Sequence, residues 1–279
     1  MTPLSPARAP ARDRGAVAGR VGFGAYLGLL VAAPILAVIW RGLADGPAAF
    51  VDAVTQSAAI DALKLSVVTG AIATAINAFV GTAIAWWLVR WDLPGRSLLA
   101  ALVDLPLAIP TLVAGIVLVA LYGPHTPVGK AFGLLGIEIA FARPGIVLAL
   151  LFVTLPFVVR AVEPVLVELD AAEEEAAYTM GAGRFTTFRR VLLPPLLPAI
   201  AAGSVQTFAR CVAEFGSIAA VSGNIVHRTL TAPVYVLGEV EGGNAGAAAS
   251  VSIVLLAVAL LLQPLAHRLA RRQDQVNNG

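Results

Sequence analysis

The residues that could do chemistry are charges inside otherwise apolar segments. Arg210 and Glu214 lie four residues apart in the segment 195–221, where one helix face would carry both. A charge in apolar surroundings is costly unless it faces a partner or water. Two interpretations follow. Either Arg210 offsets the charge of a passing anion while Glu214 holds it, or the two form a buried pair that fixes packing against another subunit, which we favour.

A second set consists of Asp104, Pro106 and Pro110 in the segment 98–122. Each proline removes a backbone donor and disturbs the carbonyl four residues earlier. An interrupted helix here would expose N–H groups that suit an oxyanion. The simpler interpretation, which we favour, is a helix start with Asp104 as its cap and Pro106 in its first turn.

Other chemistry has little support in the sequence. The single cysteine, Cys211, excludes a disulfide framework and a zinc cluster, and the three histidines are far apart without an acidic partner at ligand spacing. No nucleophile–base pair appears, and the positive charges form no basic face interleaved with aromatic residues. We therefore predict no catalytic residue, metal site or cofactor in this chain, and no nucleic-acid partner.

The elements that position these residues belong in a lipid bilayer. Of 279 residues, 58% are apolar and 13% charged, whereas a soluble domain carries about 25% charged residues. Six apolar segments can each cross about 30 Å of hydrocarbon at 1.5 Å per residue. We predict an all-α polytopic membrane protein with a membrane domain over 21–267, a disordered tail over 1–20 and a second tail over 268–279. The predicted transmembrane helices cover about 21–40, 63–89, 98–122, 145–166, 195–221 and 247–267.

Lysine and arginine predict the orientation in the membrane. Six spans put both termini on one side, and a cytoplasmic N-terminus gives that side 13 of these residues against 5 on the other. We therefore expect a multi-pass protein of the cell (plasma or inner) membrane with both termini in the cytoplasm. The polar stretch 168–194 is cytoplasmic in this topology.

This polar stretch predicts two short helices joined by a turn. Asp170 would cap the first helix and Gly181 would end it. Phe185 and Phe188 would lie on one side of the second helix as anchors for a partner. Pro194 and Pro195 would stop this helix and could open the next span, since proline is tolerated in the first turn of a helix. Apolar positions that share one face of the first helix are Leu169, Ala172, Ala176 and Met180.

The same stretch carries a motif with defined spacing. It comprises Glu175, Ala176, Ala177, Gly181, Val191, Leu193 and Pro194. This spacing resembles the EAA motif of ABC importer permeases, with Val191 where Ile is usual. The resemblance implies the type I ABC importer permease fold, in which this loop is a coupling helix seated in a groove of an ATPase subunit. The chain has no phosphate-binding Gly-x-x-x-x-Gly-Lys-Ser/Thr loop, so ATP and Mg would be bound by a partner.

Four further stretches, 104–115, 155–160, 208–216 and 222–233, extend the resemblance over about residues 20–270. They resemble the T-type subunits of sulfate/thiosulfate permeases. The resemblance implies ATP-driven import of sulfate or thiosulfate by alternating access, together with a W-type permease subunit, two ATPase subunits, an exterior sulfate-binding protein and membrane lipid. The alternatives are a molybdate or tungstate permease and an ion-coupled secondary transporter, in which Asp104, Arg210 and Glu214 would form a relay.

Overall fold

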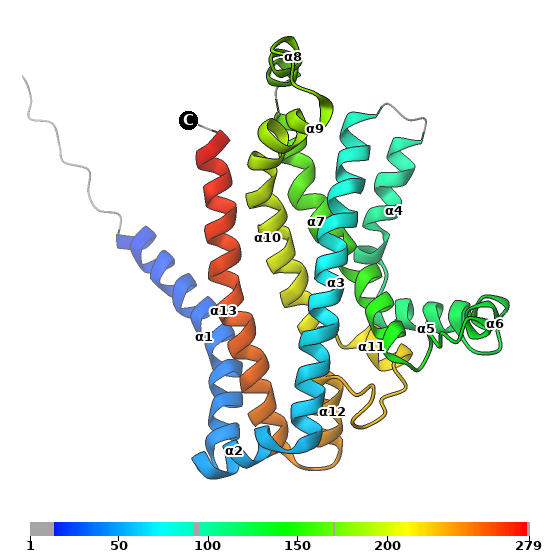
Figure 1. Cartoon of the computed structure of the whole chain (residues 1–279). Helices are drawn as coiled ribbons and strands as arrows, with labels where there is room; N and C mark the ends of the chain where they lie inside the picture. Colours follow the sequence, from blue (N-terminus) through cyan, green and yellow to red (C-terminus); the bar gives the residue numbers. More distant parts are fainter. Residues whose placement is uncertain (1–13, 92–94, 170, 278–279) are drawn as a thin grey trace, which may run out of the picture.

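The computed structural model describes residues 14–91, 95–169 and 171–277, and every regular element in these residues is a helix (Figure 1). The predicted all-α class is confirmed. In chain order the helices are α1 (Arg14–Leu43), α2 (Pro47–Thr55), α3 (Ser57–Arg90), α4 (Arg96–Ala108), α5 (Thr111–Tyr122), α6 (Pro127–Leu134), α7 (Arg143–Glu168), α8 (Ala171–Thr179), α9 (Arg184–Thr187), the π-helical segment η1 (Phe188–Leu192), α10 (Leu193–Val212), α11 (Gly216–Val221), α12 (Ala232–Glu241) and α13 (Ala245–Asn277).

Within the described residues, five helical segments are long and apolar enough to cross a membrane. They are Gly22–Leu43, Ser57–Arg90, Arg143–Glu168, Arg184–Val212 and Ala245–Leu262. The bent pair α4 and α5 supplies a sixth span if it is taken as one unit. The chain is therefore a polytopic membrane protein, as its composition predicts.

The predicted third span, 98–122, is not one helix. α4 ends at Ala108, and α5 turns away from it by 111°. Pro110 lacks an N–H group and drives Ile109 into an extended conformation with φ −90° and ψ 130°. As a result, α4 runs along the bundle while α5 runs sideways from it (Figure 1).

Other predicted boundaries also change. Residues 14–20, predicted as part of a disordered tail, form the first turns of α1, because an established helix extends at little cost; residues 1–13 lie outside the described part of the chain. The predicted fifth span, 195–221, stops at the end of α10 and resumes as α11. The predicted tail 268–279 is helical as far as Asn277, as a continuation of α13.

The centre of the bundle consists of α3, α7 and α10, which pack side by side. Val158 of α7 is fully buried between Gly81 of α3 and Gly203 of α10. A Cβ atom at Gly81 would lie 2.9 Å from the Cβ of Val158, so glycine sets how closely these helices approach. Asn77 of α3 donates a hydrogen bond of 3.0 Å to the Thr154 hydroxyl of α7, which satisfies a buried amide and fixes the register of the pair.

The two ends of the bundle carry different loops. α8 and α9 project from one end, called the α8 end below, where α3 finishes, α4 begins and the C-terminus lies (Figure 1). α2 and α12 lie at the opposite end (Figure 1). There, His227 contacts Asp61 at the start of α3 (2.7 Å), and Arg143 Nε donates to the carbonyl of Arg228 (3.0 Å). The loops predicted inside and outside the cell therefore lie at opposite ends.

Candidate functional site

The loop 168–194 begins with a short helix and a tight turn. α8 covers Ala171–Thr179, and its predicted cap, Asp170, lies outside the described residues. The N–H of Ala182 donates to the carbonyl of Ala177 (3.0 Å) and the N–H of Gly181 to that of Tyr178 (2.9 Å), which is a Schellman motif. Gly181 has a φ of 83°, a left-handed conformation that glycine adopts at little cost. Gly181 therefore ends α8, as the sequence predicts.

The second predicted helix of the loop is not separate. α9 passes through η1 directly into α10, and the N–H of Leu193 donates to the carbonyl of Phe188 within this connection. The predicted stop at Pro194 is wrong, because the helix continues through η1 into α10. Pro194 and Pro195 do lie in the first turn of α10, as predicted. Two prolines supply no N–H groups, and the wider π-helical turn accommodates the missing donors without ending the helix. The loop is thus continuous with α10.

The predicted apolar face of α8 is not the face that lies against the bundle. Ala176 and Met180 are exposed, whereas Ala177 is buried and the Glu174 side chain is only 17% exposed. Glu174 forms an ion pair with Arg90 at the end of α3. The helix is therefore rotated so that a charged side chain, rather than the apolar stripe, faces inward.

The two predicted aromatic anchors have different surroundings. Phe185 is 74% exposed, whereas Phe188 is 37% exposed and packs edge-on against Trp86 of α3, with ring centroids 5.7 Å apart. Tyr178 is also largely exposed and Glu175 faces solvent. The exposed surface of the loop thus combines aromatic side chains and small residues with both carboxylates and arginines.

Arg210 and Glu214 form an ion pair with 2.7 Å between Nη2 and Oε2. The prediction that they share a continuous helix is wrong, because α10 ends at Val212 and Glu214 lies in the break before α11. Glu214 is fully buried, and its other oxygen accepts hydrogen bonds of 3.0 Å from the backbone N–H and the hydroxyl of Ser217. The Arg210 side chain is 36% exposed. A fixed carboxylate therefore holds a partly accessible guanidinium at a helix break.

The break between α4 and α5 lies against the break between α10 and α11. A Cβ atom at Gly216 would lie 2.8 Å from the backbone nitrogen of Leu112, and one at Gly115 would lie 2.8 Å from the Cβ of Ala220. These glycines allow α5 and α11 to pack in close contact. Irregular backbone at membrane depth is tolerated only where it is buried in protein or lines a water-filled cavity. The paired breaks are therefore the candidate region for a conduction path.

Asp104 and Pro106 lie near the end of α4, not at its start. The helix begins at Arg96, after Gly95 in the left-handed conformation (φ 91°), so the favoured interpretation of Asp104 as an N-terminal cap is wrong. Asp104 instead accepts a hydrogen bond of 2.8 Å from Nε of Arg160 in α7. Arg160 was not predicted as a site residue, although its charge in the otherwise apolar segment 145–166, shared only with Glu163, was a usable signal.

The Asp104–Arg160 pair lies on a face of the helical bundle, well away from the α8 end. Each residue is about 12 Å from the α8 end of its helix at 1.5 Å per residue. The side chains are 41% and 58% exposed, and with Glu163 they line a hollow of about 450 Å³. Charged side chains at such a depth face protein or water rather than lipid. This face of the bundle is therefore covered by another subunit or lines an aqueous path.

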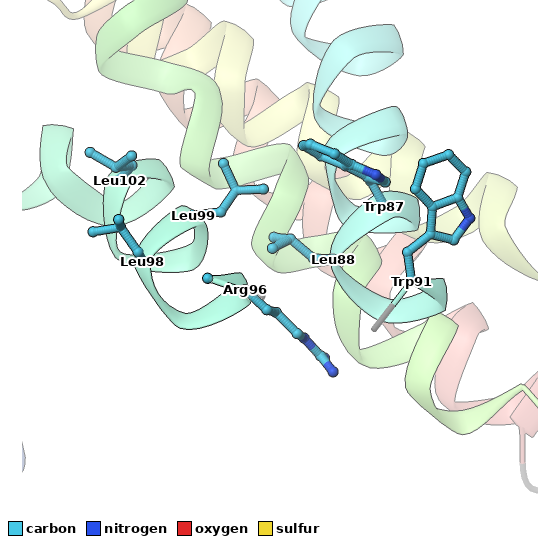
Figure 2. Close-up of a pocket in the computed structure, with 8 residues that line it drawn as sticks. Trp87, Leu88, Trp91, Arg96, Leu98, Leu99 and Leu102 are labelled. Atoms are coloured by element: carbon cyan, nitrogen blue, oxygen red, sulfur yellow. The ribbon is translucent and has the colours of Figure 1, made fainter. Parts of the chain in front are cut away.

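A second hollow, of about 300 Å³, lies between the end of α3 and the start of α4 (Figure 2). Its walls are mainly leucine and tryptophan side chains, and Arg96 adds a positive charge. Trp87 and Trp91 pack edge-on with ring centroids 6.1 Å apart. Tryptophan is typical of membrane–water interfaces, and apolar walls do not stabilise a dianion. We assign this hollow no part in conduction.

The part of the chain that the structure describes contains no candidate metal site. Among these residues, no group of three or more His, Cys, Asp and Glu side chains could hold a metal ion. Cys211 is buried, with its Sγ 3.7 Å from the hydroxyl of Thr154.

A polytopic bundle with the motif loop 168–194 at one end is the architecture expected of a class of protein, the membrane permease subunits of ABC importers. The chain belongs to the family of binding-protein-dependent transport system inner membrane components, whose model matches residues 77–275.

Two named relatives place the chain within this family. It is 42% identical over 237 residues to the sulfate transport system permease protein CysT of Synechocystis sp., covering 85% of this chain and 83% of the relative. It is 38% identical over 247 residues to the sulfate transport system permease protein CysW of the same organism, covering 88% and 90%. The chain is therefore a CysT-like permease.

The fold is also that of a solved importer. A chain of a bacterial ABC transporter involved in the import of the acidic polysaccharide alginate matches with a TM-score of 0.76 and 18% identity, covering 94% of this chain and 96% of that one. Identity at this level bears on the fold alone. The ABC importer permease fold predicted from the motif is thereby confirmed.

Proposed function

We propose that the chain is the T-type permease subunit of an ATP-driven importer of sulfate or thiosulfate. The observation that carries this proposal is the 42% identity to a CysT protein over 85% of the chain. A molybdate or tungstate permease and an ion-coupled secondary transporter are not favoured. The named relatives are sulfate permeases, and the motif loop is suited to an ATPase partner that an ion-coupled transporter would lack.

The complex contains a W-type permease subunit, two ATPase subunits and an exterior sulfate-binding protein in addition to this chain. The α8 end and both termini lie in the cytoplasm of a cell whose inner or plasma membrane holds the complex. The ATPase subunits bind ATP and Mg. ATP binding closes the ATPase pair, the coupling loops move with it, and the helices re-open to the other side.

The motif residues form the surface that the ATPase contacts. Ala176 permits close backbone approach, Gly181 shapes the turn, and the exposed Phe185 supplies the aromatic anchor. Ala177 is buried behind this surface and packs α8 against the bundle. Glu175 offers an exposed carboxylate. The remaining residues assigned to coupling lie where the loop passes into α10: Phe188, Leu193 and Pro194.

The conduction path follows the paired helix breaks. The partly exposed Arg210 offsets the charge of the passing dianion, and the buried Glu214 holds it in place. Pro110 maintains the break, while Pro106 and Asp104 lie toward the cytoplasmic side of it. The guanidinium of Arg210 is already paired with Glu214, and that of Arg160 with Asp104. The anion is therefore held weakly, which conduction requires.

The test is reconstitution of this chain with its permease partner, ATPase and binding protein in proteoliposomes. Labelled sulfate should accumulate only with ATP present, and unlabelled sulfate or thiosulfate should compete better than molybdate. Sulfate uptake by the isolated chain down an imposed ion gradient would contradict the proposal. Stronger competition by molybdate than by sulfate would reassign the cargo.

A further inference from the structure

Four side chains connect the coupling loop to the end of α3. Arg90, in the last turn of α3, forms an ion pair with Glu174 of α8, and its guanidinium lies over the ring of Trp86 at 5.4 Å from the centroid. Trp86 also packs edge-on against Phe188. The cluster therefore joins α3 to both halves of the loop, although 80 or more residues separate them in the sequence.

The ion pair is shielded from solvent. The Arg90 and Glu174 side chains are 21% and 17% exposed, whereas those of Asp104 and Arg160 are 41% and 58% exposed. Shielding strengthens the attraction between opposite charges and reduces its screening by salt. It also makes the loss of one partner costly, because the other charge stays partly buried. The pair can therefore resist a pull on the loop.

The backbone links the loop directly to only two of the three central helices. α8 is joined through the backbone to α7 before it and to α10 after it, and α10 continues from the loop without a break. α3 has no such connection, although it packs against both α7 and α10 at the centre of the bundle. The Arg90 cluster is therefore a direct route by which a force applied to the loop can reach the end of α3.

We infer that Arg90 is a positioning residue that fixes the coupling loop to α3, so that a displacement of the loop by the ATPase is delivered to α3 together with α7 and α10. Glu174 is its partner, the ring of Trp86 lies against the guanidinium, and Phe188 packs against Trp86. This inference rests on the proposed function, because it requires an ATPase that moves the loop. It adds a residue outside the motif to the coupling apparatus.

The test uses the complete complex in proteoliposomes and measures sulfate uptake and ATP hydrolysis in the same sample. Arg90→Met keeps an unbranched apolar side chain beside Trp86 but removes the charge, and Glu174→Gln keeps the size of its partner. We expect each variant to retain its ATPase subunits and to transport at least about threefold less sulfate per ATP hydrolysed. Arg90→Lys should retain most of the ratio, since it keeps the positive charge.

Two further variants separate positioning from general stability. The double variant Arg90→Met/Glu174→Gln should lose no more than Arg90→Met alone, because the two side chains act as one unit. Arg96→Met, an exposed arginine at the same end of the bundle, is the matched control and should keep the wild-type ratio. If the pair only stabilised the fold, uptake and hydrolysis would fall together and the ratio would stay constant.

Three results would overturn the inference: an unchanged uptake-to-hydrolysis ratio in both single variants, a double variant that shows the sum of the two losses, or detachment of the ATPase from the Arg90→Met complex. The last result would make the pair part of the docking surface and not a connection to α3. Each of these outcomes is distinct from failure of the proposed function, in which the wild-type complex itself shows no ATP-dependent sulfate uptake.

Discussion

The turn after α8 gives the sharpest test of the coupling loop. Gly181 has a φ of 83°, and a Cβ atom added there would meet no other atom within 4 Å. Substitution by alanine therefore creates no clash, and its whole effect is the cost of the left-handed conformation, about 1–2 kcal/mol for a residue with a Cβ atom. Such a cost lowers the ratio of the native turn to its alternative conformations by roughly 5–30-fold.

If the ATPase binds only the native turn, its apparent affinity should fall in proportion to the fraction of loops that hold this turn, by up to that same factor. The measurement is a titration of labelled ATPase subunits against the permease pair in lipid nanodiscs. Gly183→Ala is the matched control, because Gly183 has an ordinary φ of −76° and the same open surroundings. The affinity of the Gly183→Ala variant for the ATPase should be within about twofold of the wild-type affinity. Gly181→Asn should fall between the two, since asparagine tolerates this conformation better than alanine.

The interpretation fails if Gly181→Ala binds the ATPase as tightly as wild type does. It also fails if Gly183→Ala is weakened by the same factor, because the loss would then follow from any added side chain and not from the left-handed turn.

Four other changes have defined outcomes. Gly81→Ala should destabilise the bundle by about 1–3 kcal/mol through overpacking, seen as a lower Tm in detergent, while Gly238→Ala, which meets no atom within 4 Å, should not; equal shifts would argue against the packing role. Glu214→Gln should cost about 3 kcal/mol in unfolding free energy by removing a buried charge partner, and a Tm equal to wild type would contradict this. Phe185→Ala should weaken ATPase binding by about 2 kcal/mol, with unchanged affinity as the contrary result. Pro110→Ala should slow uptake per assembled complex, because a restored N–H competes with the helix break, and a wild-type rate would exclude Pro110 from the path.

The coupling loop shows how far local sequence chemistry reaches. Glycine at position 181 is readable as a helix end because only a residue without a Cβ atom adopts the left-handed conformation freely. The rotation of α8 was not readable, since the apolar spacing favours Met180 facing inward while the structure exposes Met180 and turns Glu174 toward the bundle. In this orientation Glu174 pairs with Arg90 of α3, and the loop sequence does not indicate that Arg90 lies nearby.

In the candidate conduction path, too, the local sequence predicts some features and tertiary contacts set the others. Arg210 and Glu214 carry opposite charges four residues apart, which predicts an ion pair, and the pair is present. The break between them depends on the close contact of Gly216 with α5, a helix about 100 residues earlier. Likewise, Pro110 is visible as a helix breaker, but the partner of Asp104 is set by the packing of α4 against α7.

By itself, the sequence determined the membrane class, the approximate spans, the opposite placement of the loops and the motif that names the family. These follow from composition, segment length and spacing, which act locally along the chain. Only the tertiary structure decided which charges meet, namely Arg160 with Asp104 and Arg90 with Glu174, and where the third and fifth spans break. Those features depend on contacts between helices far apart in the sequence, and a long-range contact leaves no periodicity in either of the segments that it joins.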